Sequence, residues 1–327
     1  MQLGKLKLEN NLILAPLLNI STGPYRRFCR HFGAIGLVSV PMLYSKRFAG
    51  KPESVEHELF KIKKEKPISV QLIGPDAESV KMSIDFLNSY DFDILDFNAG
   101  CPSRRSINSK EGGYLLKDID LLKVFLNTII KYSNKPVSLK LRTGFYKSNG
   151  YLEIGKIAED LGLEFITLHG RTVTKRFQST TVELETIKKL KESVSIPVVG
   201  NGDIFDPESA KKMLDYTGAD AIMIGRGSMG NPQIFSAIEK YLKTGKTETH
   251  KVQKDSLKNM IEIYENCIDT FLSGIDYPHD DFKFVELKRN SIWLSKFMKN
   301  ATLFRNNISK IKTLYNLKRE LENFFNN

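Results

Sequence analysis

The chain has 327 residues, of which 41% are hydrophobic and 27% are charged, a composition typical of globular proteins. Its formal net charge of +11 favours a polyanionic partner, although a solvated, lysine-rich surface gives the same total. Its apolar runs are too short to cross a bilayer and its N-terminus lacks a signal-peptide layout, so membrane and secreted classes are excluded and a cytoplasmic protein is expected.

The cysteines and histidines indicate whether disulfides or metal sites are expected. The three cysteines, Cys29, Cys101 and Cys267, are odd in number and far apart, which argues against a disulfide framework and for a reducing compartment. Cysteines and histidines do not cluster at the spacing of metal ligands, so no metal site is expected.

Short apolar runs recur roughly every 25 to 35 residues, with stretches of helical periodicity between them. The eight candidate strands are Leu12–Leu18, Ile35–Met42, Ile68–Ile73, Phe92–Phe97, Val137–Leu141, Phe165–Leu168, Pro197–Val199 and Ala221–Ile224. Strands that alternate with helices give right-handed crossovers and a parallel sheet. Eight such units in about 225 residues predict an α/β fold, the TIM (β/α)8 barrel. The competitor is an open doubly wound sheet, which does not require eight evenly spaced units.

Polar residues follow these runs at or just past the end of each predicted strand. In a barrel of parallel strands these ends share one mouth, where the active sites of such barrels lie. The polar residues expected there are Gln71, Asn98, Cys101, Lys140, Arg142, His169, Arg171, Asn201, Asp203 and Arg226. His169 could instead be a satisfied core histidine, but the Gly-Arg pair that follows it favours a role at the ligand.

The stretch Phe92–Pro102 presents a lone cysteine at such a strand end. Gly100 permits a tight turn and Pro102 cannot continue a strand, so Cys101 is expected on a turn, three residues after the amide of Asn98. The alternative is that Cys101 is a buried small hydrophobe, as most free cysteines are. The flanking glycine and proline favour a functional cysteine.

Glycine-containing loops, Gly200–Asp203 and Gly225–Gly227, follow the last two predicted strands. Loops at these positions form the usual phosphate site of TIM barrels, where backbone N–H groups approach an anion and Arg226 can add a charge-assisted contact. Lys140 lies inside the apolar run Val137–Leu141, where an ammonium is costly without a partner. A ligand with negative charge or carbonyl oxygens is therefore expected beside it.

The pattern changes after residue 243, where the polar segment Lys243–Lys251 is typical of a linker. The ranges that follow have helical spacing and predict a small helical bundle. These ranges are Val252–Leu272, Phe282–Lys299 and Leu303–Phe325. The predicted domains are therefore residues 1–243, a catalytic barrel, and residues 244–327, an all-α helical bundle domain.

The predicted helical domain is strongly basic. Between Lys283 and Arg319, ten Lys or Arg residues stand against one acidic residue, Glu286. A basic helical segment is often only a solvated face, but an excess this heavy favours a nucleic-acid surface.

The sequence resembles the tRNA-dihydrouridine synthases in motifs that occur in order along nearly the whole chain. The motifs are LAPLLNISTGPYR, SVQLIG, LDFNAGCPSRR followed by GGYLL, LKLRTG, LHGRT, IPVVGNGDI and MIGRGSMGNP. The C-terminal FRNNISKIKTLYNLKRELENFF is similar to the family's helical RNA-binding domain. The resemblance implies an FMN-containing barrel that reduces uridines in tRNA to 5,6-dihydrouridine, with NADPH or NADH as electron donor. A monomer is expected, although the sequence does not determine the oligomeric state. The target uridine and the choice between NADPH and NADH also stay open.

The resemblance also implies roles for individual residues. The flavin ring is expected against Pro16, Leu17, Leu18, Gln71, Lys140 and His169. The ribityl phosphate is expected at Asn201, Gly202, Asp203, Gly225 and Arg226. The substrate base is expected at Asn98, Arg142 and Arg171. Hydride would pass from flavin N5 to uracil C6, and Cys101, as a neutral thiol, would donate a proton to C5 from the opposite face.

This chain departs from the family's usual pattern at several positions. Leu17, Leu18 and Asn19 replace a methionine and an Ala-Gly pair, Gly23 replaces an aspartate, Arg176–Thr181 replaces a Tyr…Gly…Ala-Asp-Trp run, and Asn290 or Ser291 stands where a histidine is common. None of these positions is the expected donor or phosphate site, so the departures bear on substrate positioning and on the target nucleotide.

Two other functions remain as alternatives. A dihydroorotate or dihydropyrimidine dehydrogenase shares a flavin barrel and a similar cysteine loop, but it would act on a free base and leave the basic tail without a use. A barrel that only binds RNA would be expected to have lost the thiol, the lysine or the phosphate loop, and all three are present.

Overall fold

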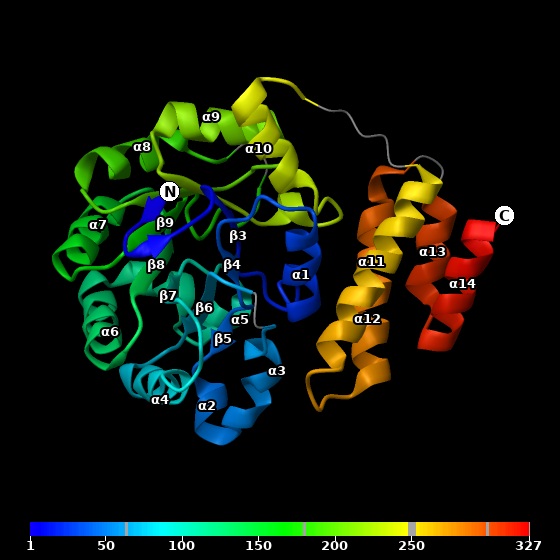
Figure 1. Cartoon of the computed structure of the whole chain (residues 1–327). Coiled ribbons are helices and arrows are strands. Elements are labelled where there is room, and N and C mark those ends of the chain that lie inside the picture. The colour runs from blue at the N-terminus through cyan, green and yellow to red at the C-terminus, as the bar shows by residue number, and fades with distance from the viewer. Residues whose placement is uncertain (63–64, 179–180, 248–252, 299–300, 327) are drawn as a thin grey trace.

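In the computed structural model, a ring of parallel strands is surrounded by helices, and a separate group of helices lies beside it (Figure 1). The structure describes residues 1–62, 65–178, 181–247, 253–298 and 301–326. The predicted TIM (β/α)8 barrel with an all-α C-terminal region is confirmed. No helix within these ranges is long and apolar enough to span a membrane.

The strands pair in parallel around the ring in the order β3-β11-β10-β9-β8-β7-β6-β4, and β5 also pairs with β6. Their bounds are β3 Leu12–Leu14, β4 Val38–Ser39, β5 Leu43–Tyr44, β6 Ile68–Ile73, β7 Ile94–Ala99, β8 Val137–Arg142, β9 Phe165–His169, β10 Val198–Asn201 and β11 Ala221–Ile224. A parallel bridge between Ile13 and Leu37 closes the ring, with the Leu14 N–H donating to the Leu37 carbonyl at 2.9 Å.

Two of the predicted strands are shorter than expected, because a proline interrupts each apolar run. The first ends at Leu14, just before the Ala15-Pro16 pair. The second, Ile35–Met42, keeps only β4, which ends before Pro41, and β5 begins just after the predicted run. Proline has no N–H to donate to a strand ladder, so neither run can pair along its whole length.

Helices cover the outside of the ring, and several of them begin at a side-chain cap. The helices are α1 Gly23–His31, α2 Lys46–Gly50, α3 Glu56–Leu59, α4 Ala77–Leu87, α5 Arg104–Asn108, α6 Ile119–Tyr132, α7 Tyr151–Asp160, α8 Leu184–Ser193, α9 Pro207–Thr217 and α10 Ile234–Thr244. Asp76, Asp118 and Asp206 each accept a backbone N–H of the first turn of the helix that follows. Such caps satisfy N–H groups that have no partner within the helix.

The amino-terminal residues close one end of the barrel. Strands β1 Gln2–Leu3 and β2 Leu6–Lys7 form an antiparallel hairpin. Its leucines join a cluster with the first residues of several barrel strands, including Ile94 and Phe165. The hairpin therefore covers the mouth formed by the strand N-termini (Figure 1), which leaves the opposite mouth for a site.

The C-terminal region contains α11 Lys254–Leu272, α12 His279–Leu294, α13 Thr302–Lys310 and α14 Leu314–Asn326. One predicted helix, Leu303–Phe325, is two helices in the structure. Lys288 Nζ donates to the carbonyls of Ser309 and Ile311, at 2.9 and 2.6 Å, and so ends α13. Residues 248–251 of the predicted linker, residue 252 of the first predicted helix and residue 299 of the second lie outside the described residues.

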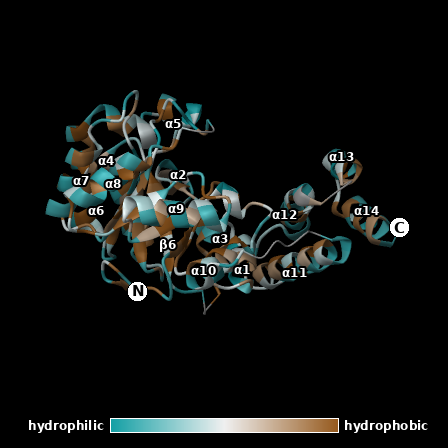
Figure 2. Ribbon diagram, turned by 90° about the horizontal axis from the view of Figure 1, so that it is seen from above, coloured by the Kyte–Doolittle hydropathy of each residue, from teal (hydrophilic) through white to brown (hydrophobic). Residues whose placement is uncertain are grey.

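The helical group contacts the barrel mainly through α1 and α11, which lie side by side (Figure 2). Gly23, at the start of α1, lies directly under the ring of Phe271 from α11, and a Cβ there would overlap that ring. The Glu286 carboxylate of α12 accepts hydrogen bonds from Tyr264 of α11 and from Thr22 of the barrel. The glycine that departs from the family pattern therefore belongs to the contact between the two parts.

Replacement of Gly23 by alanine should destabilise this contact, because the added methyl overlaps the Phe271 ring. Overpacking of this kind costs about 1–3 kcal/mol. Gly50→Ala is the matched control, since a Cβ at residue 50 meets nothing within 4 Å and the backbone there is not left-handed. Urea unfolding of both variants measures the difference, and equal stability would show that α1 and α11 do not pack as described.

Candidate active site

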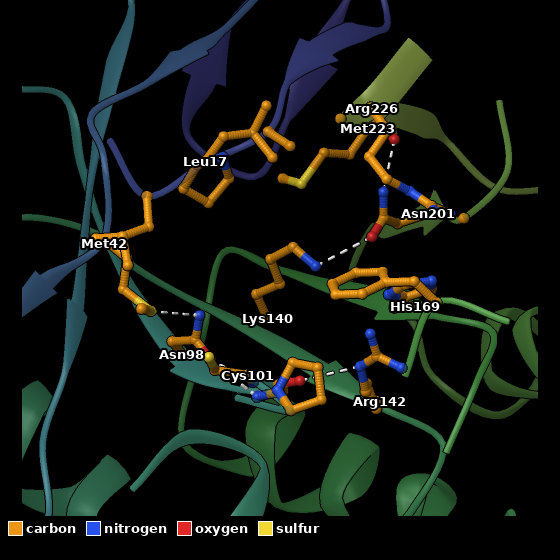
Figure 3. Close-up of a pocket in the computed structure, with 18 of the residues that line it drawn as sticks. Leu17, Met42, Asn98, Cys101, Lys140, Arg142, His169, Asn201, Met223 and Arg226 are labelled. Atoms are coloured by element: carbon orange, nitrogen blue, oxygen red, sulfur yellow. Dashed lines mark hydrogen bonds between the residues drawn. The ribbon is translucent and has the colours of Figure 1, made fainter. Parts of the chain in front are cut away.

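A cavity lies at the mouth formed by the strand C-termini, opposite the amino-terminal hairpin. Its wall includes every predicted site residue except Arg171: Pro16, Leu17, Leu18, Gln71, Asn98, Cys101, Lys140, Arg142, His169, Asn201, Gly202, Asp203, Gly225 and Arg226. Lys140 extends into the middle of the cavity, with Asn98 and Cys101 on one side and Asn201 and Arg226 on the other (Figure 3).

Asn98 shapes the turn that carries Cys101. Its Oδ1 accepts the backbone N–H groups of Gly100 and Cys101, at 3.0 and 2.9 Å. Gly113 N–H donates to the Cys101 carbonyl at 3.0 Å, and a Cβ at Gly112 would come within 2.9 Å of the Cys101 Cβ. The cysteine is therefore held from both sides.

A buried chain of hydrogen bonds fixes Asn98 in turn. Its Nδ2 donates to Gln71 Oε1 at 2.8 Å, and Gln71 Nε2 donates to Asp96 Oδ2 at 2.6 Å. Asp96 also accepts from Ser138 at 2.7 Å, and burial raises the pKa of its carboxyl. Sequence analysis did not single out Asp96, although an acid within the apolar run Phe92–Phe97 is the same signal that identified Lys140.

Within the described residues the Cys101 sulfur accepts one hydrogen bond, and it also has an apolar side. Ser106 Oγ donates to Sγ at 3.3 Å and itself receives the Ser103 hydroxyl at 2.9 Å. Tyr44 packs against the cysteine in an apolar cluster, and burial raises the pKa of its phenol. Ser106 and Tyr44 contact the sulfur only because of tertiary folding, and no motif pointed to them.

Lys140 is the ammonium nearest the centre of the cavity. Its Nζ donates to Asn201 Oδ1 at 3.0 Å, and Asn201 Nδ2 donates to the Met223 carbonyl at 2.7 Å. Burial, with a smaller contribution from Arg142, lowers the pKa of Lys140 to about 8. The ammonium makes this single hydrogen bond among the described residues, so it can still contact a ligand.

His169 is neutral and its tautomer is defined. Burial first, and then the surrounding cations, lower its pKa well below the ordinary value. Arg171 Nη1 lies 3.1 Å from His169 Nε2. Because the guanidinium can only donate, Nε2 accepts and the imidazole proton is on Nδ1.

Two predicted substrate residues are occupied by the protein itself. Arg171 is fully buried and bonds to Asp203 and to the Gln178 carbonyl, behind the cavity wall. Arg142 lines the cavity, but its guanidinium donates to the carbonyls of Gly100, Thr172 and Arg176. Both arginines therefore have clear roles in holding loops, and their contact with a base stays a prediction.

The loops after β10 and β11 suit an anion. Asp203 pairs with Arg226, at 2.8 Å, and with Arg171, so its carboxylate charge is balanced. The first N–H groups of the 3-10 turn Arg226–Ser228 have no partner within that turn. Gly202 has φ +124°, and a Cβ there would come within 2.9 Å of the His169 ring. The arrangement is consistent with the predicted phosphate site.

Phe177 is a cavity residue that the sequence did not reveal. Its exposed ring lies between the guanidinium groups of Arg142, at 5.2 Å, and Arg226, at 5.0 Å. It belongs to the predicted departure Arg176–Thr181, of which residues 179 and 180 lie outside the described residues. No cluster of potential metal ligands occurs within the described part of the chain.

The basic residues of the helical region divide into two groups. Five of the ten between Lys283 and Arg319 bond within the region, namely Lys283, Lys288, Arg289, Arg305 and Lys318. Lys310, Lys312 and Arg319 line a shared groove at the ends of α13 and α14. The charge available to an RNA is therefore smaller than the sequence count, and three of the ten basic residues share that groove.

Comparison of the sequence with known proteins identifies a family and several relatives. The family model "Dihydrouridine synthase (Dus)" matches residues 13–327. The chain is 35% identical to tRNA-dihydrouridine synthase B of Pasteurella multocida (strain Pm70), over 100% of this chain and 96% of that protein. It is 38% identical to tRNA-dihydrouridine synthase B of Pectobacterium carotovorum, over 75% of this chain and 76% of that protein.

Solved structures share the fold at low sequence identity. Morphinone reductase has a TM-score of 0.51 and 14% identity, with coverage of 77% of this chain and 90% of that chain. Histamine dehydrogenase from Rhizobium sp. 4-9 has a TM-score of 0.53 and 12% identity, with coverage of 82% of this chain. The chain spans about half the length of that dehydrogenase, 50%, so the likeness concerns the barrel fold.

Proposed function

The chain belongs to the dihydrouridine synthase family, and we propose that it reduces uridine bases of tRNA to 5,6-dihydrouridine. The observation that carries this proposal is the cavity itself. Within a chain that matches the family from residue 13 to residue 327, one cavity brings together a positioned thiol, a central ammonium and the glycine-containing loops with Arg226. A base reductase needs a proton donor on one side of the base and a cofactor on the other.

FMN is the proposed cofactor, and the cavity wall fits it. The Lys140 ammonium can donate to a ring carbonyl oxygen or to negative charge on the ring, beside the amide of Gln71. The phosphate would bind at Gly202, Gly225 and Arg226, where backbone N–H groups and a guanidinium converge. When bound, FMN supplies the hydride to C6 of the uracil, and NADPH or NADH is the proposed electron source.

Cys101 is the proposed acid that protonates C5. The hydrogen bonds from Gly100 and Cys101 N–H to Asn98 fix the backbone of the thiol, so Sγ faces the cavity at a defined position. An acid in this role must carry its proton, and one side of the cysteine packs against the apolar cluster that contains Tyr44. After proton transfer, the Ser106 hydroxyl, 3.3 Å away, can stabilise the thiolate.

Arg142 of the wall and Arg171 behind it are proposed to position the base. Arg142 and Arg171 hold the loops around His169 and Phe177, and Arg142 lines the cavity where the base would enter. A uridine must leave its stack to reach the cavity, and an unpaired nucleotide of a tRNA loop does so at low cost. The helical region, residues 244–327, is the proposed tRNA-binding domain, with Lys310, Lys312 and Arg319 contacting phosphates.

Cys101→Ala should keep flavin and tRNA binding but lower the single-turnover rate about 100-fold or more, which is what a general acid typically contributes. The assay reduces the bound flavin without oxygen, adds unmodified tRNA, and follows the visible flavin band. Cys267→Ala, which removes a thiol outside the cavity, is the control. Turnover equal to the unaltered protein would remove Cys101 as the acid, and reoxidation by free uracil or orotate would point to a free-base dehydrogenase.

Flavin affinity should fall as the pH rises through about 8, because Lys140 then loses the proton that it needs for the flavin contact. Since binding favours the charged form, one proton is taken up on binding, and the dissociation constant should rise by up to about tenfold per pH unit above that value. Flavin fluorescence titration between pH 7 and 9.5 measures it. Lys140→Met should bind weakly with little pH dependence, and Lys123→Met, on an outer helix, should behave as the unaltered protein. A constant affinity across this range would refute the contact.

Replacing Lys310, Lys312 and Arg319 together by alanine should weaken tRNA binding and reduce the salt dependence of the dissociation constant by about two to three log units per log unit of salt. Flavin binding should not change, since the groove lies on α13 and α14. The control removes three exposed lysines elsewhere, Lys7, Lys123 and Lys212. A salt slope equal in both variants would show that this groove does not contact the phosphate backbone.

A further inference from the structure

A second feature at the same mouth of the barrel is a lysine surrounded by aromatic rings. Lys117 Nζ lies 4.8 Å from the ring centre of Tyr114, 4.2 Å from that of Phe145 and 5.5 Å from that of Tyr146. Tyr114 and Lys117 belong to the 3-10 turn Gly112–Lys117 after α5, and the other two rings lie just after β8. We call these four residues the rim cluster.

One aromatic ring of the rim cluster is exposed to solvent and is not part of the packed interior. The side chain of Tyr146 is 68% exposed, whereas Phe145 beneath it is 8% exposed and belongs to the interior. The two ring centres lie 4.6 Å apart at an interplanar angle of 67°. Most of the apolar surface of Tyr146 therefore stays in water, at a cost that a partner would recover.

The loop that carries Tyr146 is held in one conformation. Gly144 has φ +153°, and a Cβ there would overlap the Lys147 carbonyl, so the turn requires glycine. The Phe145 carbonyl accepts both the N–H and the hydroxyl of Thr174, at 3.1 and 3.2 Å. A ring presented by such a loop binds without a large loss of conformational entropy.

The charge beside the ring is positive and available. Lys117 is exposed and has no carboxylate within 4 Å among the described residues. The neighbouring carboxylate, Asp118, caps α6 by accepting the Leu121 N–H at 2.9 Å. An aromatic face next to an unpaired ammonium matches an unstacked nucleotide, whose base stacks on the ring while its phosphate meets the charge.

The position of the rim cluster suggests which nucleotide it binds. Its two loops also adjoin the cavity: Gly113 in the 3-10 turn bonds to Cys101, and Arg142 of the cavity wall precedes Tyr146 by four residues, or about 14 Å of chain at most. A base on Tyr146 is therefore near the mouth of the cavity. We propose that Tyr146 and Lys117 bind an unpaired tRNA nucleotide close in sequence to the reduced uridine, and so help to select the target position. This inference rests on the proposed function, because it assumes that tRNA is the substrate.

The test compares tRNA dissociation constants of matched variants of the full chain loaded with flavin. Tyr146→Ala should weaken binding about 5- to 150-fold, the range that loss of one stacked base produces, and Tyr146→Phe should bind as tightly as the unaltered protein. Lys117→Gln should reduce the salt slope by about one. Tyr216→Ala, a 49% exposed tyrosine on the outer helix α9, is the control and should have no effect.

Thermal unfolding and flavin content of each variant exclude a folding defect, and the KM for NADPH is measured alongside. Unchanged tRNA affinity in Tyr146→Ala would overturn the inference while tRNA still reoxidises the flavin, which leaves the proposed function intact. A raised KM for NADPH with unchanged tRNA affinity would also overturn it and assign the ring to the nicotinamide nucleotide. Failure of tRNA to bind or to reoxidise the flavin of the unaltered protein would overturn both.

Discussion

Closure of the parallel strands into a ring is the constraint on which the site depends. The bridge between Ile13 and Leu37 joins β3 to the residue just before β4. The other strands of the ring pair in parallel with their neighbours. Parallel strands send all of their C-termini to one mouth, so loops far apart in the chain meet there. The amino-terminal hairpin closes the other mouth with leucines. Only one end of the barrel is therefore left for chemistry in this uridine reductase.

The interior of that mouth is polar, and each polar group there supports another. Asp96, Gln71 and Asn98 form a chain of hydrogen bonds that ends on the N–H groups of the cysteine turn. A buried amide with unsatisfied groups is costly, so this chain leaves Asn98 little freedom to move. On the other side, Arg171 and Asp203 fix the tautomer of His169 and the position of Arg226. The site is thus preorganised by residues that do not themselves react.

The departures from the usual family pattern have different physical meanings. Gly23 is explained by packing, because only glycine leaves room for the Phe271 ring of the helical region. Phe177, in contrast, lies in the cavity wall between two guanidinium groups, where it bears on what the cavity accepts. Glu286, the one acid in the basic segment, is buried against Tyr264 and Thr22 and joins the two parts of the molecule. These residues therefore bear on two different features, the contact between the barrel and the helical region and the wall of the cavity.

The sequence alone determined the barrel, the mouth that carries the site and most of its wall, because apolar runs at regular spacing and polar residues at strand ends are local signals. It also indicated that Lys140 and Cys101 are unusual. Lys140 lies inside an apolar run, where a buried ammonium is costly, and Cys101 lies on a turn at a strand end. Tertiary structure decided the rest. Asp96 and Tyr44 reach the site through contacts between separate strands, and Ser106 reaches the sulfur because the chain turns into α5 after Cys101. Arg171 bonds Asp203 behind the cavity wall, and five of the ten basic residues between Lys283 and Arg319 bond within the helical region. Such pairings depend on which segments become neighbours, and no local pattern of residues records that.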